Sequence, residues 1–157
     1  MIDSNRSRLV LHGSVILLIA LACGLPSVVE VSDGITRMWQ AAHSALLLMA
    51  VWMFAQAAIL PLIVLKEVET SVLTWALIAA AYSLSFAAIV QAITGVRALG
   101  PSTSIVNMSV FVANLVVVLG SFLSASITLM GARNAKSRLR PSERADSGSG
   151  KTVEPTV

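Results

Sequence analysis

The chain has 157 residues, of which 56% are hydrophobic and only 12% charged, and its mean hydropathy is +0.83. The charged share is about half that of an ordinary soluble domain, so a soluble fold of this size could not cover so much apolar surface, and the bilayer must take part of it. The net charge of +3 does not indicate a nucleic-acid partner, because most basic residues sit in one short C-terminal segment.

Four long uncharged stretches predict four transmembrane helices, over residues 9–29, 38–65, 70–96 and 102–132. Each stretch reaches or exceeds the roughly 20 residues that an α-helix needs to cross a ~30 Å hydrocarbon core. Lysine, arginine, aspartate and glutamate all lie outside the cores of these stretches, as the cost of a charge at mid-bilayer requires. The predicted fold class is therefore an all-α membrane protein, a four-helix bundle in which short connections make consecutive helices antiparallel neighbours.

The distribution of basic residues predicts the orientation of the chain, because cytoplasmic segments of membrane proteins are enriched in Lys and Arg. Arg6 and Arg8 precede the first helix, whereas the two opposite loops hold only Arg37 and Arg97. Six basic residues follow the fourth helix: Arg133, Lys136, Arg138, Arg140, Arg144 and Lys151. Both termini are predicted to be cytoplasmic, and residues 133–157, which have no apolar face, to form a disordered basic tail.

Few groups inside the predicted helices can carry chemistry. The sequence has no Gly-rich phosphate loop, His-Glu-x-x-His motif, Cys-x-x-Cys pair or membrane carboxylate, which removes most enzyme classes and most proton-coupled transporters. His12 lies near the start of the first helix and His43 near the start of the second, so antiparallel packing places them most of a bilayer apart. His12 is expected to hydrogen-bond to a neighbouring helix. His43 either does the same or ligates haem iron, for which a neutral imidazole is the commonest protein ligand.

Polar side chains also occur in the third and fourth helices. Tyr82, the only tyrosine, lies near the middle of the third helix, with Trp75 seven residues earlier on the same face. A mid-membrane hydroxyl needs a partner, so Tyr82 is predicted to face the interior. The fourth helix carries a polar stripe at seven-residue spacing: Asn107, Asn114, Ser121 and Thr128. In lipid, such a stripe either makes hydrogen bonds between helices or points into a polar cavity.

Five short motifs, in a fixed order along the chain, carry a resemblance to a known family. They are Leu11-His12-Gly13, Trp39-Gln40-Ala41-Ala42-His43-Ser44, Pro61 eighteen residues after His43, Trp75 with Tyr82, and Gly100-Pro101. In these motifs and in its four spans the chain resembles the styrene oxide isomerases, small bacterial membrane enzymes, over residues 6–132. The spacing from Trp75 to Tyr82 is one residue longer than in that family.

The resemblance implies an enzyme of the bacterial cytoplasmic membrane that binds haem b, with His43 as axial ligand, in a homotrimer with haem at subunit interfaces. Its ferric iron would act as a Lewis acid on the oxygen of an apolar aryl epoxide. Ring opening and a 1,2-hydride shift would then give an aldehyde without net redox change. Tyr82 would correspond to the active-site tyrosine of the family. Asn114 and Asn107 of the fourth helix are candidate catalytic residues that could compensate for a family asparagine missing from this chain.

The chain departs from the family pattern close to His43. The asparagine six residues after the axial histidine is Met49 here, the glycine after the His-Ser pair is Ala45, and the arginine two residues before the histidine is Ala41. The residues that the resemblance implies for haem binding are therefore better matched in this chain than those it implies for the isomerase reaction. The alternative function is a non-catalytic four-helix membrane subunit or a small carrier. An electron-transfer haem protein is disfavoured, because a single axial histidine leaves the sixth iron position open.

Overall fold

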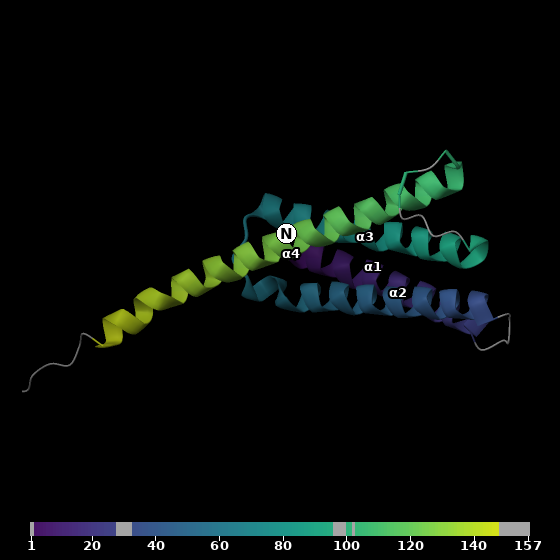
Figure 1. Ribbon diagram of the computed structural model, residues 1–157. Coiled ribbons are helices and arrows are strands. Elements are labelled where there is room, and N and C mark those ends of the chain that lie inside the picture. Colours follow the sequence, from purple (N-terminus) through teal and green to yellow (C-terminus); the bar gives the residue numbers. More distant parts are fainter. Residues whose placement is uncertain (1, 28–32, 96–99, 102, 148–157) are drawn as a thin grey trace, which may run out of the picture.

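The computed structural model describes residues 2–27, 33–95, 100–101 and 103–147 (Figure 1). Four long helices account for most of them: α1 (Ile2–Gly24), α2 (Asp33–Ile59), α3 (Glu67–Thr94) and α4 (Ile105–Ser147). All four are long and apolar enough to cross a membrane, and no strand occurs among the described residues. The chain is therefore an all-α, multi-pass membrane protein, as its hydropathy predicts.

Proline and glycine residues set several helix ends. Pro26 and Pro61 lie in the short 3₁₀ turns Leu25–Ser27 and Leu60–Leu62 that follow α1 and α2, because a proline ring has no N–H to continue the α-helical ladder. At the other end of α3, Gly95 adopts a left-handed conformation (φ 71°), and its N–H donates to the carbonyl of Gln91 at 2.9 Å. This bond closes the last turn of the helix.

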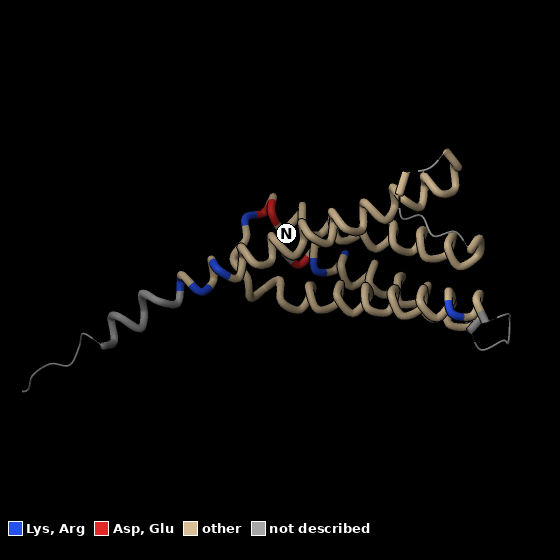
Figure 2. Tube along the Cα trace, viewed as in Figure 1, with Lys and Arg blue, Asp and Glu red and all other residues tan. Residues whose placement is uncertain are grey.

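Charged residues gather toward the ends of the bundle and leave its middle uncharged (Figure 2). At the α2–α3 connection the backbone N–H of Lys66 donates to the Glu69 carboxylate at 2.8 Å, and Glu67 adds a second negative charge to the first turn of α3. Both carboxylates complement the positive N-terminal end of the helix dipole. The cytoplasmic location of the termini stays a prediction.

Helix α4 continues to Ser147 and so passes Ala132, where the sequence predicts the start of a disordered tail. Arginine occurs four times and alanine twice in residues 133–147, and both are strong helix formers. Extending an existing helix also avoids the cost of nucleation. Residues 148–157 lie outside the described residues, and the division of the chain into a bilayer domain and a tail stays a prediction.

Helices α1, α2 and α3 contact one another, and α4 packs mainly along α3. The main core lies among the first three helices and contains the fully buried Leu9, Ile16, Leu46, Met53 and Leu77. The α3–α4 contact depends on small residues instead. A Cβ on Gly120 would lie 2.7 Å from the carbonyl oxygen of Ala76, so only glycine permits this approach of the two backbones.

Candidate functional site

His43 lies on α2 with its ring against α1. Its Nδ1 is 2.7 Å from the carbonyl oxygen of Ala20, which can only accept a hydrogen bond, so Nδ1 carries the proton and donates. In the neutral ring this leaves an unprotonated lone pair on Nε2. Within the described part of the chain, Nε2 makes no hydrogen bond. The contact with Ala20 therefore leaves Nε2 as the nitrogen through which a neutral His43 could ligate a metal.

Gly24 makes room for this ring at the end of α1. A Cβ at this position would lie 2.9 Å from Nδ1 of His43 and 3.1 Å from Cε1, closer than side-chain carbons normally approach. The sequence analysis missed both Gly24 and the acceptor Ala20. A glycine in the last apolar turn of the first helix is the only signal that pointed to such a contact.

His12 and Tyr82 form a second polar pair, between α1 and α3. Nδ1 of His12 and the hydroxyl of Tyr82 are 3.0 Å apart, and the rings meet edge to face with centroids 5.7 Å apart. The predicted hydrogen bond of His12 to a neighbouring helix is confirmed. The Tyr82 hydroxyl has an interior partner, as predicted, but the residue is 39% exposed, so its ring lies at the surface of the single chain.

The structure places Tyr82 beside His12 and not beside His43. The partners of the two pairs on α1, His12 and Ala20, are eight residues apart, which corresponds to about 12 Å along the helix. The predicted separation of the two histidines by most of a bilayer is therefore too large. The reason is that α1 begins at Ile2 and not at Leu9, so His12 lies in the middle of the helix.

The polar stripe of α4 faces the other helices, since all four of its side chains are half-buried. At its C-terminal end, the hydroxyl of Thr128 donates to Oε1 of the buried Gln56 on α2 at 3.0 Å, and lies 2.8 Å from the carbonyl of Ser124. Asn114 lines a cavity instead, and Asn107 lies two helical turns nearer the start of α4. The stripe thus serves both predicted purposes, interhelical bonding and cavity lining, at different depths.

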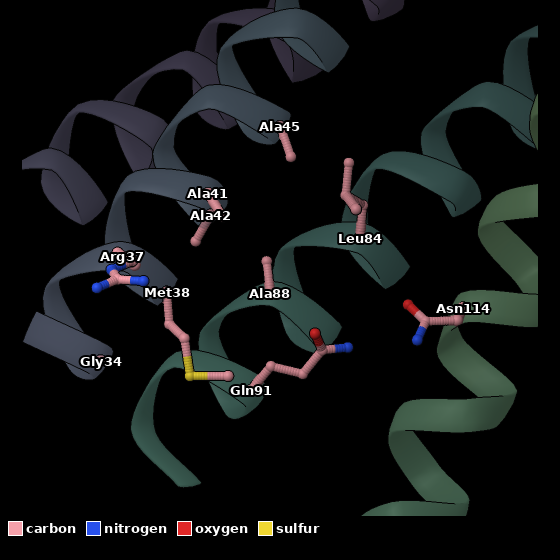
Figure 3. A pocket seen from close by; sticks show the side chains of 10 residues that line it. All are labelled: Gly34, Arg37, Met38, Ala41, Ala42, Ala45, Leu84, Ala88, Gln91 and Asn114. Atoms are coloured by element: carbon pink, nitrogen blue, oxygen red, sulfur yellow. The ribbon is translucent and has the colours of Figure 1, made fainter. Parts of the chain in front are cut away.

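Two adjoining pockets open between α2 and α3. The first, of about 520 Å³, also reaches α4 and is lined by the ten residues labelled in Figure 3, among them Arg37, Gln91 and Asn114. The second, of about 420 Å³, is lined by apolar residues that include Met49 and Trp52. Neither pocket is lined by His43 or Tyr82. On α2, the first pocket occupies the helix face opposite His43.

Among the described residues, no three or more His, Cys, Asp or Glu side chains lie close enough together to hold a metal ion. Haem needs only one such ligand, because the porphyrin supplies the other donors. The bond from His43 to Ala20 matches what haem-ligating and metal-ligating histidines require, a partner that fixes the tautomer and the ring orientation. His43 therefore fits the axial position.

Fold and site together define a multi-pass membrane protein with two histidine-centred polar contacts inside the bilayer. A sequence model of the family described as styrene oxide isomerase matches residues 5–133, most of the chain. The chain belongs to the styrene oxide isomerase family. No curated protein and no solved structure gives a match.

Proposed function

We propose that the chain is a haem b isomerase of the bacterial cytoplasmic membrane that converts an apolar aryl epoxide to an aldehyde. The observation that carries the proposal is the bond from Nδ1 of His43 to Ala20, in a chain that belongs to the styrene oxide isomerase family. Ferric haem, held by His43, would supply a Lewis acid for epoxide opening and a 1,2-hydride shift to an aldehyde, without net redox change.

The part of His43 in this function is to hold the haem. The carbonyl of Ala20 accepts the Nδ1 proton and directs the Nε2 lone pair away from α1, and this bond raises the basicity of the ligating nitrogen. The spans contain no carboxylate that would compete for the epoxide or deliver a proton. A metal that His43 would hold is therefore the proposed Lewis acid for opening the epoxide.

The part of Tyr82 is to position the epoxide oxygen by donating its hydroxyl proton. It can do so only when that proton is not already donated to His12. If Nδ1 of His12 carries a proton, His12 donates to the Tyr82 oxygen, and the Tyr82 hydrogen is available for substrate. A chain of two such bonds also polarises the hydroxyl and strengthens it as a donor. His12 is thus a positioning residue that acts through Tyr82.

The partners of Tyr82 and His43 on α1, His12 and Ala20, are about 12 Å apart along that helix. Tyr82 and His43 of one chain therefore do not reach a single epoxide oxygen, and the proposal requires a neighbouring copy in the homotrimer to supply its Tyr82. The surrounding side chains are apolar and exclude water, which favours the aldehyde over a diol. The catalytic roles predicted for Asn107 and Asn114 stay predictions, since Asn114 lines a pocket on the opposite face of α2 from His43. A homotrimer is proposed on the family resemblance.

The test is aldehyde formation from styrene oxide by haem-loaded protein in membranes, in the ferric state and without added reductant. We expect turnover by the wild-type chain and none by His43→Ala. A Soret band without conversion of styrene oxide or of larger epoxides would contradict the isomerase assignment but support haem binding. The absence of a Soret band from haem-replete membranes would favour a non-catalytic subunit or carrier.

A further inference from the structure

The two pockets between α2 and α3 adjoin, because Ala45 and Leu84 line both. Together they form what we call the α2–α3 groove. Along α2 it extends from Arg37 to Trp52, a rise of about 22 Å in a helix. This length is most of a ~30 Å hydrocarbon core and exceeds one leaflet. The groove therefore follows the direction in which lipid chains lie.

One end of the groove is polar and is built by three helices. Arg37 comes from the first turns of α2, Gln91 from the last turns of α3 and Asn114 from α4 (Figure 3). In the described part of the chain, neither carboxamide makes a side-chain hydrogen bond and the Arg37 guanidinium forms no ion pair. These donors are therefore available to a ligand that brings matching acceptors to the edge of the bilayer.

The other end of the groove is apolar. Met49, Trp52 and Leu84 form its walls, and alanines at positions 41, 42 and 45 of α2 leave space between the helices. Each pocket has the volume of a small-molecule site, about 300–1,000 Å³. A neighbouring helix is about 10 Å across with its side chains and could not enter either pocket. The groove fits a single chain-like ligand.

We propose that the α2–α3 groove binds one long-chain amphipathic anion. Its oxyanion meets the guanidinium of Arg37, which binds carboxylates and phosphates through two parallel hydrogen bonds. Gln91 and Asn114 line the same pocket on the far side from Arg37 (Figure 3) and offer further N–H donors to polar groups of the ligand, and the hydrocarbon chain lies along Leu84 toward Trp52. A phospholipid phosphate and a fatty-acid carboxylate both present this chemistry. The proposal uses neither haem nor epoxide and goes beyond the proposed function.

Quenching of Trp52 fluorescence tests the site directly. In a Trp39→Phe/Trp75→Phe background Trp52 is the only tryptophan, and micelles would be titrated with stearate, phosphatidylglycerol or phosphatidylcholine, each brominated at mid-chain. We expect saturable quenching by one or both anionic probes and weak quenching by phosphatidylcholine. The stearate and phosphatidylglycerol titrations show which source of the oxyanion the groove prefers.

Substitutions at the polar end supply the controls. Arg37→Gln should weaken saturable quenching about tenfold or more, and Gln91→Leu/Asn114→Leu should weaken it less, because charge-assisted bonds are the stronger ones. Arg133→Gln, an equally exposed arginine on α4, should leave quenching unchanged. Native mass spectrometry of the unmodified chain should show one bound anion that Arg37→Gln loses.

Two results would overturn the proposal. Equal quenching by all three probes, unaffected by Arg37→Gln, would mean that the groove meets bulk detergent and lipid only. Protection of Trp52 from every probe, together with disulfide formation between two Ala45→Cys chains, would mean that a second copy covers the groove. None of these measurements depends on haem content or epoxide turnover. A failure of the groove proposal is therefore distinguishable from a failure of the proposed function.

Discussion

The two histidine contacts use the same helix α1 in opposite ways. At the His43 contact, α1 offers a backbone carbonyl, which only accepts, so the position of the proton on the ring is settled. At the His12 contact, α1 offers the imidazole itself to a tyrosine hydroxyl, which can donate or accept. One contact holds a ring in a single protonation pattern, and the other can reverse the direction of its hydrogen bond.

This difference separates two requirements of the proposed chemistry. A metal ligand must keep one lone pair pointing in one direction, and a rigid acceptor provides that. A group that handles substrate must be able to present a proton, and a hydroxyl–imidazole pair provides that. Substitutions at the two contacts should therefore have separable effects, on haem binding at one and on turnover at the other.

The largest expected effect is the loss of haem on His43→Ala, because no other described side chain offers a fixed imidazole lone pair at that place. Absorption spectra of purified protein should lack the Soret band. His12→Ala should keep the band, since the proposal assigns His12 to the contact with Tyr82 and not to the haem. Equal Soret bands in both variants would contradict the assignment of His43.

Crowding the His43 ring should weaken haem binding without removing the ligand. Gly24→Ala places a methyl group 2.9 Å from Nδ1, and overpacking of this kind costs about 1–3 kcal/mol. Haem affinity, measured by titration of the apoprotein, should fall roughly 5- to 150-fold. Gly100→Ala is the matched control, because its added Cβ meets no atom of the described residues within 4 Å. An equal loss in both variants would indicate a general effect on folding.

Removing the Tyr82 hydroxyl should act on turnover alone. Losing one hydrogen bond in a dry site costs on the order of 1–3 kcal/mol, which corresponds to about 5- to 150-fold in rate. Tyr82→Phe should therefore slow aldehyde formation and leave the Soret band in place. Unchanged turnover would show that the hydroxyl serves only to bond to His12.

A smaller effect is expected at His12, which acts through Tyr82. His12→Ala should slow turnover about three- to tenfold, as for a neutral hydrogen bond of about 1 kcal/mol. His12→Asn can place an amide N–H near the position of Nδ1–H and should restore part of the rate. A residue that merely fills space would respond in the same way to both substitutions, with no rescue by the donor.

The smallest effect is expected at Met49, which lies in the wall of the second pocket where the family has asparagine. Met49→Asn should leave the rate unchanged or raise it by no more than about tenfold, the value of one added hydrogen bond. Aldehyde formation per haem is the appropriate measure. A marked decrease would show that the methionine itself shapes the substrate site.

The sequence was sufficient to predict the helices, because the cost of charge in lipid confines charged residues to their ends. It misplaced the start of α1, since Asp3, Arg6 and Arg8 are tolerated at the bilayer surface within a helix that begins at Ile2. His43 and Tyr82 were found one by one from residue type. Their partners Ala20 and His12 were not, because hydropathy does not determine how each helix is rotated or how deep it sits.

Leu48 and Val51 line the second pocket and are also 73% and 60% exposed on the outer surface of α2. In a membrane that surface borders acyl chains, so a molecule exchanges with the pocket sideways through hydrocarbon. Its occupancy is then governed by the mole fraction of the molecule dissolved in lipid. Partitioning enriches an apolar molecule there about tenfold for each 1.4 kcal/mol of transfer free energy. At a fixed total amount of ligand, adding lipid therefore lowers occupancy by dilution in two dimensions.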